Sequence, residues 1–142
     1  MVESIIPRVN PLVAHAKDVL TLLTAIQDQN HERVNELLQV IPIETVVNDI
    51  GMTVFNYVCA NCDDWKIIEA VINRGPYINT MDSAGRTPLH NAARKLVNNH
   101  TQQVNLKLIT ILLDPQSGAN KEAIMTRGRE TPLMYAVMGG KM

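Results

Sequence analysis

The chain has 142 residues and a formal net charge of −1, with acidic and basic residues mixed along its length. This is the size of one ordinary domain, and the charge gives no basis for binding nucleic acid or an anionic membrane surface. Hydrophobic residues make up 46% of the chain but only one Trp, three Tyr and one Phe are among them, a composition that favours small packed helices over a β-sandwich.

The N-terminal segment does not read as a secretory signal, because Glu3, Pro7, Arg8 and Pro11 interrupt its apolar residues. No apolar run approaches the length needed to span a membrane. We therefore expect a cytoplasmic or nuclear protein that is not secreted. In such a compartment its two cysteines would be free thiols.

The first expected helix begins with Asn10 as the N-cap and Pro11 as the first helical residue, and apolar residues then recur at helical spacing over 11–26. A second helix is expected over 32–40, where Pro42 stops it. Gln29 lies in the turn between these helices.

The next expected helix begins after Thr53, whose hydroxyl can cap it, and carries Asn56 at its third position. An apolar stripe over 67–72 predicts a further helix that Asp63 or Asp64 starts. Gly75 follows as a C-terminal glycine.

Residues 82–93 form the most informative stretch. Asp82 and Gly85 favour a tight turn, Thr87 is an N-cap, and Pro88 suits the first helical position. The ring of His90, at the third helical position, can reach back to the cap as the Glu of a capping box does. We assign structural roles to Thr87, Pro88, Leu89, His90, Ala92 and Ala93.

The segment Thr-Pro-Leu-His-Asn-Ala at 87–92 resembles the TPLHxA signature of the ankyrin-repeat family. Thr53 lies 34 residues earlier, close to the repeat length of about 33, and Thr131 lies 44 residues later. This resemblance implies an all-α solenoid of stacked antiparallel helix pairs with projecting β-turn fingers. Asn56 replaces the signature histidine in one unit, so there we expect the bond from histidine to the cap to be lost.

The resemblance divides the chain into an N-terminal capping region and about four units. We expect these at 1–23, 24–47, 48–81, 82–125 with an insertion between its helices at 95–103, and 126–142. The last unit ends where its second helix is only starting, which leads us to expect a fragment of a longer array. Gln29 stands where the family usually has glycine.

The implied function is that of a non-catalytic scaffold, adaptor or inhibitor that binds another protein through its concave face and turn tips. By position, the family's contact residues are Ile50, Met52, Ala60, Asn61, Ser83, Ala84, Arg86, Arg94, Lys95, Arg129, Glu130, Tyr135 and Met138. Of these, Arg86, Arg94 and Lys95 either select a partner with an acidic patch or form a solvated basic face. A regulatory domain of a larger enzyme or channel is the alternative.

Cys59 and Cys62 form a CxxC pair, which leaves a thiol or metal protein as a distant alternative. A structural zinc site needs about four ligands, and the sequence has no second pair. We therefore expect no metal, no cofactor and no catalytic residue. His15, His31 and His100 are isolated in the sequence. Trp65 either packs within the protein or binds a ligand or partner.

Asn79 resembles the asparagine that some ankyrin proteins present to a hydroxylase. Val71 and Tyr77 stand where a leucine and an acidic residue are preferred, so modification is not expected. A hydrogen bond from Asn79 to the backbone of the next unit is the expected role.

Overall fold

The computed structural model describes residues 16–98, 103–125 and 129–139. Within these ranges the chain is all-helical apart from one isolated β-bridge, Val46 to Thr53. The expected caps Asn10 and Pro11 lie outside the described residues. The elements are α3 (Ala16–Gln27), α4 (His31–Leu38), α5 (Val54–Asn61), α6 (Trp65–Ile72), α7 (Pro88–Asn98), α8 (Gln103–Leu113), η2 (Pro115–Ser117) and α9 (Pro132–Gly139).

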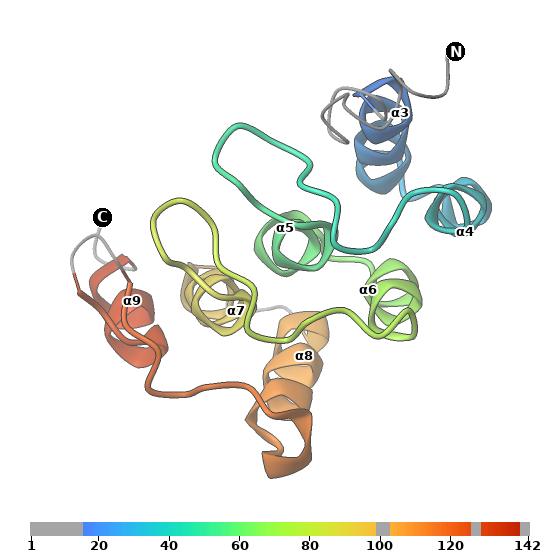
Figure 1. The fold of residues 1–142 in the computed structure, drawn as a ribbon. Helices are drawn as coiled ribbons and strands as arrows, with labels where there is room; N and C mark the ends of the chain where they lie inside the picture. The colour runs from blue at the N-terminus through green and yellow to red at the C-terminus, as the bar shows by residue number, and fades with distance from the viewer. Residues whose placement is uncertain (1–15, 99–102, 126–128, 140–142) are drawn as a thin grey trace.

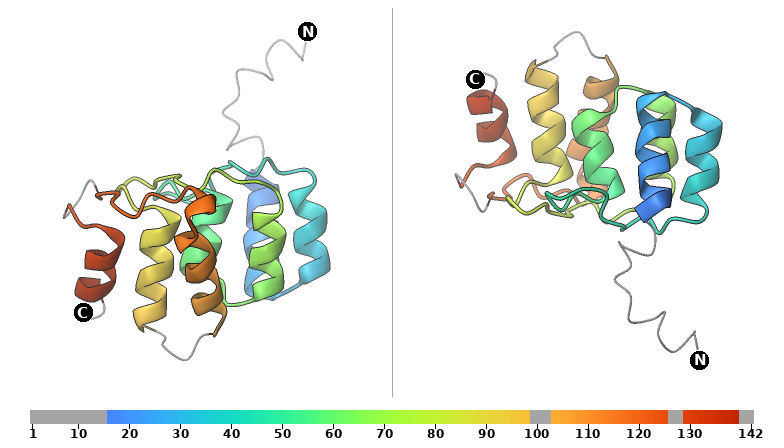
Figure 2. Two further views of the ribbon diagram at one scale, coloured as in Figure 1. Left: turned by 90° about the horizontal axis from the view of Figure 1, so that it is seen from below. Right: turned by 90° about the horizontal axis from the view of Figure 1, so that it is seen from above.

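The helices form two rows, with α3, α5, α7 and α9 in one row and α4, α6 and α8 in the other (Figure 1). Consecutive helices pair across the rows, as α3 with α4, α5 with α6 and α7 with α8. Contacts along the first row then join α5 to α7 and α7 to α9. The turns that connect one pair to the next lie at one end of the helices (Figure 2).

The core lies between the rows and is mainly aliphatic, as the composition predicts. In α4 the predicted apolar face is buried through Val34, Leu37 and Leu38. In α6 it is buried through Ile67, Ile68 and Val71, and Asp64 caps this helix by accepting the N–H groups of Lys66 and Ile67. In the last described helix, α9, Leu133 stays 73% exposed.

The expected boundary at residue 23 falls inside α3, which is one continuous helix. Its buried residues Val19, Leu22 and Ile26 follow one stripe that crosses the boundary. The helical spacing of this stripe explains why the chain does not break there.

The expected insertion at 95–103 is only partly an insertion between helices. Residues 95–98 extend α7, and Gln103 begins α8, so both helices have 11 residues where α5 and α6 have 8. The sequence of α7 continues with Arg, Lys and Leu, which are good helix formers, so nothing ends the helix at residue 94. The surplus therefore lengthens this helix pair at the end opposite the turns (Figure 2).

Gln29 has a left-handed backbone conformation, with φ of 56°. The turn nevertheless closes, because the N–H of Asn30 donates to the carbonyl of Ala25 at 2.9 Å. Side chains other than glycine are strained in this conformation. The turn therefore forms at an energetic cost that glycine would avoid.

We predict that Gln29→Gly stabilises the protein. Relief of about 1–2 kcal/mol of left-handed strain exceeds the entropic cost of glycine of about 0.5–1 kcal/mol, for a net gain of about 0.5–1 kcal/mol. Urea unfolding measures this gain in the free energy of unfolding. The matched control is Gln39→Gly, at a position with φ of −77°, where the same change should destabilise. Equal effects at both positions would contradict this account.

Candidate functional site

The side chain of His90 joins one helix pair to the next. Its Nδ1 accepts hydrogen bonds from the hydroxyl of Thr87 at 2.8 Å and from the backbone N–H of Thr87 at 3.2 Å, which confirms the predicted contact with the cap. With Nδ1 as an acceptor, Nε2 carries the proton and donates it to the carbonyl of Glu130, 2.8 Å away. His90 is fully buried, and burial lowers its pKa below the ordinary value of 6.5.

One unit earlier, Asn56 occupies the position of His90 and, of the side-chain contacts that His90 makes, has only the hydrogen bond to the next turn. Its amide donates to the carbonyl of Arg86 at 3.0 Å, and Arg86 precedes Thr87 as Glu130 precedes Thr131. The histidine contact with the cap is absent at this position, as expected, but the bond to the next turn is kept. Asn91 donates in turn to the amide oxygen of Asn56. Sequence reasoning missed this function of Asn56, because its partner lies 30 residues away.

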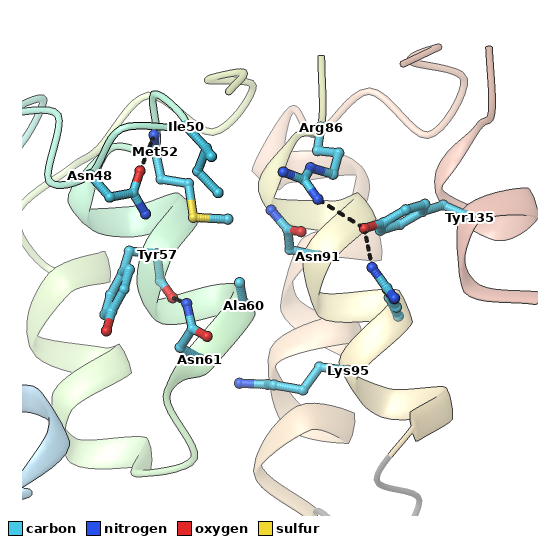
Figure 3. Close-up of a pocket in the computed structure, with 11 residues that line it drawn as sticks. Asn48, Ile50, Met52, Tyr57, Ala60, Asn61, Arg86, Asn91, Lys95 and Tyr135 are labelled. Atoms are coloured by element: carbon cyan, nitrogen blue, oxygen red, sulfur yellow. Dashed lines mark hydrogen bonds between the residues drawn. The ribbon is translucent and has the colours of Figure 1, made fainter. Parts of the chain in front are cut away.

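A groove of about 520 Å³ runs over α5, α7 and α9 on the face away from the second row (Figure 3). Its wall on the α5 side is largely apolar, and its wall on the α7 and α9 side carries charge. The residues that line it are Asn48, Ile50, Met52, Tyr57, Ala60, Asn61, Arg86, Asn91, Arg94, Lys95 and Tyr135.

Eight of these eleven residues were expected as partner contacts from the sequence. Three others line the groove as well, Asn48, Tyr57 and Asn91. Tyr57 lies one helical turn before Asn61, and the periodicity of α5 places it on the same face as an alternative contact. No comparable signal marks Asn48 or Asn91.

The remaining expected contacts lie away from the groove. Ser83 is exposed on the turn, and its N–H donates to the carbonyl of Ile50 at 2.8 Å. Ala84 donates its N–H to Asp82. Arg129 is exposed in the turn before α9 with φ of 54°, and the carbonyl of Glu130 accepts from His90.

Met138 belongs to α9, and its side chain lies outside the described structure.

Arg86 is held mainly by the turn that precedes α7. Its Nε donates to Asp82 Oδ2 at 2.7 Å, and the other carboxylate oxygen accepts the backbone N–H groups of Ala84 and Arg86. The Asp82 side chain is 0% exposed and that of Arg86 is 20% exposed. Removing Arg86 would leave a buried carboxylate without its charge partner, so this residue is part of the turn as well as of the groove.

The hydroxyl of Tyr135 accepts hydrogen bonds from two arginines. Arg94 donates from Nη1 at 2.6 Å and Arg86 donates from Nη1 at 3.2 Å (Figure 3). The Arg94 guanidinium also lies over the Tyr135 ring, with its carbon 5.0 Å from the ring centroid. Burial by itself lowers the pKa of Arg86, but the hydrogen bond that it donates to Tyr135 and the charge of Asp82 raise it overall.

Lys95 turns away from the two arginines. Its ammonium donates to the carbonyls of Val58 and Cys62, at the C-terminal end of α5, and lies 3.6 Å from Asp63 Oδ1. Its side chain is 11% exposed, and burial lowers its pKa. The expected basic cluster therefore separates into an arginine pair and a lysine that caps a neighbouring helix.

Both thiols of the CxxC pair are buried. Burial raises the pKa of Cys59 and of Cys62, so both remain protonated near neutral pH. Cys62 is the C-cap of α5 and donates through sulfur to the carbonyl of Asp64. Over residues 16–98, 103–125 and 129–139, no group of three or more His, Cys, Asp or Glu side chains could hold a metal ion.

His31 and Asp64 form a contact that the sequence did not indicate. His31 Nε2 lies 2.6 Å from Asp64 Oδ2, across the two helix pairs. Burial alone would raise the pKa of Asp64, but the hydrogen bond and the charge of His31 lower it. His31 is therefore not isolated, because it supports the N-cap of α6.

Trp65 and Asn79 both have structural partners. The ammonium of Lys107 lies 4.5 Å from the centroid of the half-buried Trp65 ring. Asn79 donates to the carbonyl of Gly118 and accepts the N–H of Asn120, which confirms its predicted bond to the next unit. Asn120 instead accepts the N–H of Glu122 within its own turn.

The sequence matches no protein-family model, and it has no significant match among curated proteins. In the part of the chain that the structure describes, no helix has both the length and the apolar character that crossing a membrane requires.

We predict that stability falls as pH drops below about 6.5, because burial lowers the pKa of His90 in the folded state while the unfolded state keeps the ordinary value. Between the two values only the unfolded chain binds the proton. The slope from this group is at most about 1.4 kcal/mol per pH unit, and it ends below the folded pKa. The midpoints of urea unfolding at pH 7.5 and pH 5.5 measure this loss of stability. In His90→Gln this part of the slope should vanish, and an unchanged slope would refute the assignment.

We also predict slow modification of both thiols in the folded protein. An aromatic disulfide reagent at pH 8 should label fewer than one thiol per chain over the time in which the urea-unfolded chain labels two. The Cys59→Ala variant assigns any residual rate to Cys62. Rapid labelling of the folded chain would show a reactive thiolate and revive the thiol alternative.

Proposed function

We propose that the chain is an ankyrin-repeat protein that binds another protein through the groove over α5, α7 and α9. The groove is the observation that carries the proposal. Because it draws residues from three successive first-row helices and the turn at 48–52, it presents an extended surface rather than an enclosed pocket. Extended surfaces of this kind are how stacked-repeat proteins bind partners.

The ankyrin assignment rests on recurring local structure. Hydroxyls of Thr53, Thr87 and Thr131 each accept the N–H three residues later, at 3.4, 3.3 and 3.3 Å. Each cap starts a first-row helix, and the two earlier ones are followed by a second-row helix. The repeated cap, the paired helices and the turns at one end support the family that 87–92 resembles.

The residues in the groove suit recognition. It offers apolar surface from Ile50 and Ala60 beside amide and guanidinium donors from Asn61 and Arg94. Mixed surfaces with aromatic and arginine side chains are typical of protein interfaces. The thiol alternative is disfavoured, because burial raises the pKa of both cysteines.

Ala60 gives the sharpest test, because it lies on the groove wall and its small side chain leaves room for a partner. We predict that Ala60→Arg blocks the groove and weakens partner binding at least about tenfold. Cross-linking of a tagged chain in cells would identify partners, and calorimetry on the purified pair would measure affinity.

The matched control is Thr110→Arg, which adds the same side chain at an exposed position on α8, in the other row. Thermal melts establish that both variants are folded. Partners that bind folded Ala60→Arg as well as wild type would place the interface outside the groove.

A further inference from the structure

The arginine pair and Tyr135 form a subsite that lacks an acceptor. Arg94 Nε is buried and has no hydrogen-bond partner, although Nη1 of the same guanidinium donates to Tyr135. Buried donors in folded proteins are nearly always paired, and an orphaned one costs free energy. The same side chain lines an open groove, so its guanidinium borders a space that the acceptor group of a ligand can enter.

The charges around this subsite leave one cation uncompensated. Arg86 is paired with the buried carboxylate of Asp82, and Lys95 lies 3.6 Å from Asp63. Among the ion pairs of the described residues, none joins Arg94 to a carboxylate. The groove therefore has an excess of one positive charge, which matches a monoanion.

The donors have the geometry that a carboxylate prefers. A guanidinium presents neighbouring N–H groups as a planar fork, and the two oxygens of a carboxylate accept from such a fork. The hydroxyl of Tyr135 accepts from both arginines, so its own O–H remains a donor beside them. A phosphate would bring more negative charge than the single excess cation balances.

The opposite wall defines the rest of the ligand. Ile50 is 41% exposed, and Met52, Tyr57 and Ala60 line the groove beside it. Asn61 adds an exposed amide that suits a peptide backbone, whereas the amide of Asn91 already donates to Asn56. The groove is lined from three successive first-row helices, so a chain can pass through without ending there.

We propose that the groove binds a segment of a partner protein in which an Asp or Glu side chain, next to an apolar residue, is held by Arg94 and Tyr135. This inference rests on the proposed function and adds the chemistry of the recognised segment. The carboxylate pairs with the Arg94 guanidinium from the groove side, and the apolar neighbour lies on the α5 wall.

The test uses the Arg Nε–H signals of the ¹⁵N-labelled full chain. The acidic probe is the capped peptide Ac-Leu-Glu-Leu-NH₂, and Ac-Leu-Gln-Leu-NH₂ removes only the charge. The Arg94 signal should shift saturably with the acidic probe, and the neutral probe should bind at least about tenfold more weakly. No saturable shift of Arg94, or equal binding of both peptides, would overturn the proposal.

Two further probes separate the sources of the anion. Tighter binding of Ac-Leu-Gly-Leu with a free C-terminus would assign the subsite to a chain terminus, and tighter binding of inorganic phosphate would show that charge alone selects the ligand. Either result overturns the side-chain assignment. We expect both to bind more weakly than the acidic probe.

Two variants test whether the Arg94 guanidinium binds the carboxylate of the probe. Arg94→Lys keeps the charge and removes Nε, so the affinity for the acidic probe should fall about tenfold. The control is Lys107→Gln, which removes a distant cation near Trp65 and should leave that affinity unchanged. Unchanged affinity in Arg94→Lys would overturn the assignment. If partner binding depends on Ala60 but the carboxylate probes fail, the proposed function stands and this inference falls.

Discussion

The hydrogen bond from the third residue of one first-row helix to the carbonyl just before the next cap holds successive helix pairs in register. Asn56 makes it to Arg86, and His90 makes it to Glu130. A buried carbonyl needs a donor, so each turn is tied to the helix before it. Replacing this side chain by one without a donor would remove both the bond and the spacing that it sets.

The groove depends on that spacing. Tyr135 of α9 meets Arg86 and Arg94 of the preceding unit only because α7 and α9 pack in register. Gly51 serves the same purpose at the turns, because it has φ of 80° and an added Cβ would lie 3.3 Å from the backbone N of Ser83. The turns therefore approach closely enough to border the groove.

The cost of desolvating a charge determines which groups the cations of this surface contact. Asp82 is fully buried and takes Arg86, while the carbonyls at the end of α5 take Lys95. A buried charge without a partner is costly, so these two residues first serve the fold. Arg94 packs on an aromatic ring, and no ion pair among the described residues joins it to a carboxylate.

The sequence by itself determined the helices, their caps and their buried faces, because hydroxyl caps, Pro at the first position and 3.6-residue periodicity act within one turn of chain. It also placed eight residues on what proved to be one groove. Only the tertiary structure decided what those side chains contact. The partners of Lys95 and Arg94 lie 33 and 41 residues away, and local sequence does not determine which groups meet across stacked helices.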